Sequence, residues 1–499
     1  MFDKAFLLLV CFSTLSALEV LRCEDEGPYY AKFLPKNYGN VIPGGNMTLT
    51  GRCFKQMKIS FTETEKEFKL EYFVKDKESW YCNEFLIATS GKTLKTDFAL
   101  LPGRYYLSWD KSSITPAETS YIQKRGVRIL LSCDSTFNWL KDIWMTLKLF
   151  VGGMGTNPNI PIFGSKIPDY QLNANIDWIK GYAGYEWVKR EDPKTLSIDK
   201  NEIESGTFVA IVRLDGIDQL IHIGSGSRVG HSTIALWDRE EDELYILESQ
   251  DAAYFPTKNI QKTKWDDWVK FAHNADFNVV LFPLNDEYQA KFDEAKAWEW
   301  FKEIGGTPYG FHNFLFGWLD DVDKNIPDIL DLNFVTNILQ VIELVSPDIA
   351  HLMFLEAFNM RLGTNHDNIS DIWEELYQRD MTLEELVEIV EKEEWSYSDG
   401  HNYVCSSFVV SVYRRAGIFG DMQIESTELG PKDLYELAIY DLTGNKIPKG
   451  CEEYSKRGYC QIMGKIDFDV GKANFVKPYA HMAEKCPSIA PLYERSEGC

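Results

Sequence analysis

The ten cysteines of this chain divide it into three regions and limit how each can fold. Four lie between positions 23 and 133, four lie between positions 451 and 499, and Cys11 lies in an apolar segment at the start. Two sets of four are typical of disulfide-stapled regions in an oxidising compartment. Cys405 belongs to neither set and has no obvious disulfide partner. A zinc site is not indicated, because no C-x-x-C pair has a matching partner pair.

The first 17 residues have the pattern of a secretory signal peptide. A short charged start precedes an apolar run at 5–12, and small residues follow as far as Ala17. This run is too short to span a bilayer, and no other uninterrupted apolar run is long enough. N-glycosylation sequons at Asn46 and Asn368 fit the same route. We therefore expect a protein of the secreted or endolysosomal lumen with no transmembrane segment.

Length and charge narrow the classes of protein. A chain of 499 residues with 44% hydrophobic and 14% aromatic content can form two or three globular domains. The formal net charge of −24 argues against nucleic-acid binding, which needs a basic face to meet phosphates. The simplest interpretation of the acidity is solubility.

Hydrophobic periodicity predicts a β-rich module at 18–135. Residues 57–61 and 68–74 alternate at period two, and further strands are expected at 104–109 and 127–131. Short strands, Gly and Pro turns and four cysteines favour a small disulfide-stapled sandwich. A connecting segment at 136–200 follows, with a helix expected at 137–151.

A second domain is expected at 201–420, with α+β character. Strands are predicted at 206–213, 232–237, 244–248 and 277–284, and helices at 288–304 and, buried, at 333–345. His222 lies in a short apolar run that also reads as a strand. Thr382 opens a capping box and so a further helix. Strands followed by helices indicate an α+β domain. Residues 421–499 are expected to wrap it as a loop-rich extension with cysteines.

Three residues of this domain form a candidate catalytic group. His231 begins one predicted strand, and Glu248 ends the next strand after a charged turn, so the two should be neighbours. Cys405 begins an apolar run typical of a helix. A helix N-terminus carries partial positive charge and favours a thiolate. The imidazole can accept the thiol proton, the carboxylate can orient the imidazole, and the Cys405 N–H can stabilise an oxyanion.

Other interpretations of these residues stay open. His231 could be a structural histidine, and Cys405 a buried inert thiol. His401, four residues before Cys405, is the second candidate for the base. Tyr309 and Tyr403 are core or turn aromatics, or they line a substrate cleft. The aromatic segment 310–318 is core packing or an apolar acyl or peptide pocket.

The order of these motifs resembles the circularly permuted papain-like superfamily. The motifs follow one another along the chain in a fixed order. Gly-His before a strand comes first, then a hairpin ending in Tyr-x-x-Glu, then Pro308-Tyr309-Gly310, and finally Tyr-x-Cys-Ser-Ser-Phe-Val. The resemblance covers 201–420 and points to the permuted NlpC-type group, with YiiX-like amidases and the lecithin retinol acyltransferase branch as relatives. It implies an antiparallel sheet packed with helices. The long insert between Tyr309 and Tyr403 departs from compact relatives.

By this resemblance Cys405 is the nucleophile, His231 the base and Glu248 the orienting acid. A glutamate in the third position is more similar to the YiiX-like amidases. We expect a cysteine amidase or peptidase that cleaves a peptide or peptidoglycan-like bond through a thioester, with no metal or organic cofactor. Its substrate would be a peptide, a glycopeptide or an acyl lipid. The alternatives are a thioester-forming lipid acyltransferase or esterase, a non-catalytic secreted scaffold that binds a ligand, and a disulfide-rich structural protein.

Overall fold

The computed structural model describes most of the chain between residues 35 and 479. The described ranges are 35–77, 82–99, 101–135, 138–141, 166–183, 185–214, 217–250, 259–314, 332–451 and 458–479. The expected signal peptide at 1–17, most of the helix expected at 137–151, and the three cysteines Cys23, Cys486 and Cys499 lie outside these ranges.

The chain forms two compact units, each built from two separated segments. Unit 1 contains residues 1–148 and 326–389, and unit 2 contains residues 149–325 and 390–499. The domain expected at 201–420 therefore has other bounds than either unit. Residues 326–389 belong to unit 1 with the N-terminal module, and unit 2 also includes residues 149–200 and 421–499. Both units mix helices with antiparallel sheets, so the expected α+β class is confirmed.

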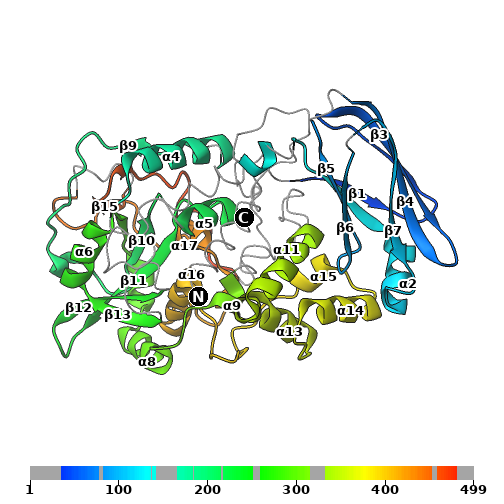
Figure 1. Ribbon diagram of the computed structural model, residues 1–499. Helices are drawn as coiled ribbons and strands as arrows, with labels where there is room; N and C mark the ends of the chain where they lie inside the picture. Colours follow the sequence, from blue (N-terminus) through cyan, green and yellow to red (C-terminus); the bar gives the residue numbers. More distant parts are fainter. Residues whose placement is uncertain are drawn as a thin grey trace. The chain divides into compact units, whose positions relative to one another are not determined.

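Unit 1 contains two four-stranded antiparallel sheets (Figure 1). One has the order β1-β8-β5-β6 (Lys36–Val41, Val127–Leu131, Phe85–Thr89, Leu94–Phe98), and the other the order β2-β3-β4-β7 (Asn46–Leu49, Phe54–Glu63, Glu67–Lys77, Gly103–Asp110). Period-two alternation explains β4, where Phe68, Leu70, Tyr72 and Val74 are buried in the core. The expected β-rich module is thus formed, and a Cys53–Cys82 disulfide staples it.

Helices complete unit 1. The helix α2 (Pro116–Arg125) lies within the β-rich segment, and the others are α11 (Leu332–Val345), α12 (Pro347–Ala350), α13 (Glu356–Leu362), α14 (Ile369–Arg379) and α15 (Leu383–Val387). Thr382 forms the expected capping box with Glu385. The helix expected to be buried at 333–345 is only half buried, because Leu344 is 85% exposed and Val341 is 52% exposed.

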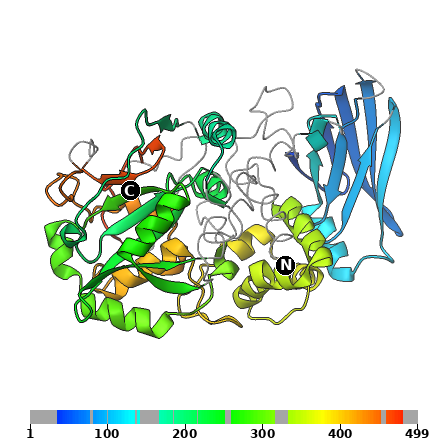
Figure 2. The ribbon, with the colours of Figure 1, turned by 60° about the vertical axis from the view of Figure 1, so that its left-hand side comes forward.

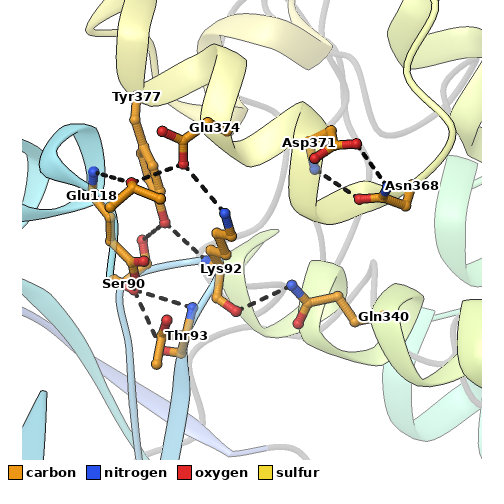
Figure 3. A network of polar contacts seen from close by, with 10 residues as sticks. Ser90, Lys92, Thr93, Glu118, Gln340, Asn368, Asp371, Glu374 and Tyr377 are labelled. Carbon is orange, nitrogen blue, oxygen red and sulfur yellow. Dashed lines mark hydrogen bonds and ion pairs between the residues drawn. The ribbon is translucent and has the colours of Figure 1, made fainter. Parts of the chain in front are cut away.

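A polar network holds the helices of unit 1 against its strands (Figure 3). The Lys92 ammonium lies 3.2 Å from a Glu374 carboxylate oxygen on α14. The Tyr377 hydroxyl donates to the Ser90 carbonyl at 3.2 Å and accepts from the Lys92 backbone N–H at 3.0 Å. The Gln340 amide of α11 donates to the Lys92 carbonyl at 3.2 Å. These contacts join positions more than 240 residues apart in the sequence, which is why local patterns could not assign 326–389 to this unit.

The turn at Gly91 depends on the absence of a side chain. Its φ is +108°, and a Cβ there would lie 2.4 Å from the Trp373 ring. We predict that Gly91→Ala lowers the free energy of unfolding by well over the roughly 1 kcal/mol that a strained φ alone costs. Gly39→Ala is the matched control, because Gly39 has φ +91° with open space around its Cβ position. Urea unfolding of both variants measures the difference, and equal losses would contradict the packing argument.

Unit 2 is built on a six-stranded sheet whose neighbouring strands are all antiparallel. Its order is β13-β12-β11-β10-β14-β15 (Ile260–Lys264, Glu243–Ser249, His231–Asp238, Phe208–Val212, Asn278–Phe282, Cys460–Met463). The four strands expected here are present, and β13 and β15 were not expected. The C-terminal extension thus adds a strand to the sheet, and a disulfide joins Cys460, the first residue of that strand, to Cys451. The short strands β9 (Val188–Lys189) and β16 (Ile466–Asp467) pair separately.

Unit 2 also contains helices. They are α4 (Asp169–Ala183), α5 (Ile217–Ser225), α6 (Trp265–Asn274), α7 (Asp286–Lys291), α8 (Glu294–Ile304), α9 (Phe311–Phe314), α16 (Cys405–Arg415) and α17 (Pro431–Glu436). The expected helix at 288–304 is two helices, because Asp293 caps a new start. The expected strand around His222 is wrong, since His222 lies in α5. Figures 1 and 2 show α16, in orange, beside the green strands, and it packs on β11 and β12.

Among the described residues, no helix combines the length and the apolar character that crossing a membrane requires.

Candidate functional site

The thiol of Cys405 stands at the first position of α16. Val404 before it is extended, with φ −74° and ψ 176°, and no side chain caps the helix. The backbone N–H groups of the first turn have no acceptors within the helix, so they can serve a bound oxyanion. Cys405 is buried and is the free cysteine among the described residues.

The turn before Cys405 is fixed from two sides. The Ser249 hydroxyl donates to the Tyr403 carbonyl at 2.8 Å, and the Gly310 N–H donates to the same carbonyl at 3.0 Å. Tyr309 and Tyr403 also form a parallel β-bridge. A Cβ at Gly310 would lie 2.5 Å from the Tyr403 backbone, so only glycine allows this approach. The thiol of Cys405 is therefore held on rigid backbone.

His231 and Glu248 meet across the β11–β12 hairpin, as the sequence predicts. Nε2 of His231 lies 2.9 Å from Oε2 of Glu248, and both side chains are almost completely buried. The hairpin register, with Ile234 opposite Leu247, brings the start of β11 beside the end of β12. Because Nε2 faces the carboxylate, Nδ1 is the ring nitrogen left for another partner.

The Cys405 thiol also lies within hydrogen-bond reach of the His231 ring. Burial by itself lowers the pKa of the imidazole, but the hydrogen bonds and negative charges of Cys405 and Glu248 outweigh it and raise the pKa of His231 to about 10. The ring therefore keeps its proton at neutral pH. The three residues selected from the sequence are in contact.

The sequence did not identify Trp268 as part of this site. It lies in α6, is fully buried, and its indole N–H donates to Oε1 of Glu248 at 3.2 Å. Both oxygens of the carboxylate are thus engaged, one by His231 and one by Trp268. An indole on an apolar helix face gives no sequence signal of a polar contact.

Comparisons with protein-family models, curated proteins and solved structures gave no match to this chain.

A narrow pocket of about 20 Å³ opens at the thiol. That volume holds little more than one water molecule. Most of its wall is apolar, with Ile221 of α5, Phe314 of α9, Leu429 and Pro431 among the residues that line it. Ser406 and Thr427 supply hydroxyl groups. The wall beside the thiol is thus mainly apolar, with two hydroxyl-bearing residues.

The structure separates the two tyrosines proposed for the substrate cleft. Tyr309 lines the pocket. Tyr403 does not line it, since it is buried and its hydroxyl donates to Glu393 at 3.1 Å. His401, the second candidate for the base, packs beside the Tyr403 ring, and no contact with the thiol is found for it. The aromatic segment 310–318 is described only as far as Phe314, which lines the pocket.

Glu393 is another residue that the sequence did not single out. Its buried carboxylate accepts from Tyr403, from the Ser426 hydroxyl at 2.7 Å and from Arg414 of α16. It therefore ties the turn before the thiol to α16 and to the segment that carries Thr427. We assign it a structural role.

Both sequon asparagines lie on unit 1. Asn46 is exposed at the start of β2. Asn368 caps α14, where its Oδ1 accepts from the Asp371 N–H at 2.9 Å. The Asn368 Nδ2 donates to the Asp371 carboxylate at 2.7 Å. A glycan on Nδ2 would leave the cap in place.

The raised pKa of His231 gives the site a definite dependence on pH. Its value of about 10 lies above the 6.5 of an unperturbed histidine. The stability that the charged ring contributes is therefore complete below about pH 6.5 and is lost as the pH rises toward about 10. We predict that the unfolding free energy lost in His231→Gln is larger at pH 6 than at pH 9.5. Urea unfolding at both pH values measures this loss. A loss that grows with pH would contradict a raised pKa for His231.

Proposed function

We propose that unit 2 is a cysteine hydrolase that cleaves an amide bond through a thioester. The observation that carries the proposal is the contact of a buried free thiol at a helix N-terminus with an imidazole that a buried carboxylate holds. A thiol and an imidazolium in contact favour the thiolate, and the helix N-terminus adds to this. A structural protein has no need of such a group, because burying the charges is unfavourable.

The reaction follows from these positions. The Cys405 sulfur attacks the carbonyl carbon, and the carbonyl oxygen gains the negative charge within reach of the first-turn N–H groups of α16. His231 then gives its proton to the leaving nitrogen, the C–N bond breaks, and an amine leaves behind the thioester. Water next gives a proton to His231 and attacks the thioester. The C–S bond breaks, which releases a carboxylic acid and restores the thiolate and the imidazolium.

The lining of the pocket favours a second candidate. Aliphatic and aromatic side chains surround the thiol, so an acyl chain suits the site at least as well as a polar peptide. An acyltransferase or esterase uses the same thioester and differs only in the group that leaves or accepts. The permuted papain-like arrangement, with histidine before cysteine along the chain, belongs to this proposal. A location in the lumen of the secretory or endolysosomal route is also part of this proposal, and the two disulfides support it.

Alkylation by iodoacetamide tests the reactive thiol. We predict that Cys405 is labelled at about pH 6 almost as fast as at pH 8, because the protonated His231 ring beside it favours the thiolate at both pH values. His231→Ala should slow labelling at pH 6 at least about tenfold. His273→Ala is the matched control, since His273 is an exposed histidine of the same unit. Labelling that rises steeply with pH and is the same in all three proteins would refute the catalytic proposal.

Turnover tests the reaction itself. With a panel of peptidyl coumarin amides and p-nitrophenyl esters of increasing chain length, Cys405→Ala should lose about 10³-fold or more of any activity. Ester cleavage that increases with acyl length, without amide cleavage, would favour the second candidate. Fast labelling without turnover of either series would favour the ligand-binding scaffold.

Trp268 should act through Glu248. Trp268→Phe removes one hydrogen bond to the carboxylate and is expected to lower kcat/KM about tenfold, since a hydrogen bond to a charged group is worth roughly 1.5–3 kcal/mol. The alkaline limb of the pH profile should move to lower pH, because a less firmly held carboxylate stabilises the imidazolium less. Trp265→Phe is the control, a buried tryptophan of the same helix. A purely structural role would change stability alike in both variants and leave the pH profile in place.

A further inference from the structure

Unit 1 contains a polar cavity that the proposed reaction does not use. Its volume is about 210 Å³, far above the roughly 10–15 Å³ that one water needs. One wall comes from the strands and α2, with Thr89, Ser90 and Arg128, and another comes from the start of α15, with Thr382 and Glu384. Segments more than 250 residues apart in the sequence thus form one cavity.

Hydrogen bonds hold these walls in place. Arg128 of β8 donates to the Glu384 carboxylate at 3.2 Å, and Arg125 donates to the Asp380 carbonyl at 2.8 Å. Below them the Tyr121 and Tyr377 rings pack with centroids 4.7 Å apart. Ser90 belongs to the network in Figure 3, where its hydroxyl donates to Glu118 at 2.7 Å. The cavity is therefore part of the rigid junction between sheet and helices.

The lining excludes most classes of ligand. It contains hydroxyl, amide, guanidinium and carboxylate groups and no aliphatic side chain, so an apolar ligand would leave polar groups unpaired. Each arginine already faces a carboxylate, Arg128 at Glu384 and Arg125 at Asp380. An anion would have to compete with those carboxylates, and a cation would meet two guanidinium groups.

A neutral ligand rich in hydroxyl groups satisfies all of these conditions. Sugar hydroxyls both donate and accept hydrogen bonds, so they can pair with guanidinium and carboxylate groups side by side. The ring of Tyr121 can receive the C–H face of a sugar. The side chains of Arg125 and Glu384 are 33% and 38% exposed, so the cavity is open to solvent. We propose that this cavity binds a single saccharide residue and that unit 1 recognises a glycan.

This proposal is independent of the cysteine chemistry, and binding tests it without turnover. The full chain is titrated by saturation-transfer NMR with the methyl glycosides of glucose, galactose, mannose and N-acetylglucosamine. At least one should bind. Arg128→Met should weaken its binding about tenfold, the effect of losing roughly 1.4 kcal/mol. Asn40→Ala should weaken it as well, because Asn40 lines the same cavity from β1.

Arg104→Met is the matched control. Arg104 pairs with Glu71 at 3.0 Å on the other sheet of unit 1, as Arg128 pairs with Glu384, but lies outside the cavity. Its variant should bind the glycoside as the unaltered protein does. Unfolding midpoints identify a variant that fails to fold, and Asn40, on the surface, then carries the test. Three results would overturn the proposal: no glycoside binds, inorganic phosphate or a short peptide binds in preference, or all variants bind alike.

Discussion

The strictest requirement on the fold of unit 2 is that a buried imidazole and a buried carboxylate stay hydrogen-bonded to each other. Neither charge is stable there alone, because a buried ion without a partner is strongly unfavourable. The β11–β12 hairpin brings His231 and Glu248 within 2.9 Å, and the indole of Trp268 engages the second carboxylate oxygen. The position of α16 then brings a thiol to the same imidazole. Removing any one of these elements would leave a charge in the core with too few partners.

Local patterns were sufficient for the parts of the site that lie within one element or one hairpin. The charged turn between two apolar runs predicted that His231 and Glu248 are neighbours, and the apolar run after Cys405 predicted its helix. These predictions succeed because the physical cause, strand pairing or a helix start, lies within a few residues. The alternation in β4 and the capping box at Thr382 are of the same kind.

The failures have a different origin. The apolar run around His222 is too short for its hydrophobic period to distinguish a strand from a helix. In the structure this segment is the helix α5, which packs against α4. Trp268 looks like any core tryptophan until its partner is known. The assignment of 326–389 to unit 1 depends on contacts such as Trp373 against Gly91, between positions that no local pattern connects. Pairing over such distances is decided by tertiary structure alone.

The β-bridge between Tyr309 and Tyr403 bears on how such a chain could have been assembled. Residues 326–389, which supply helices to unit 1, lie in the sequence between these two tyrosines, whose backbones pair within unit 2. A segment that is flanked by paired residues can lengthen, shorten or be exchanged while the sheet of unit 2 keeps its register. Cys405 follows Tyr403 by two residues. The same β-bridge thus joins the two parts of unit 2 on either side of residues 326–389 and directly precedes the start of α16.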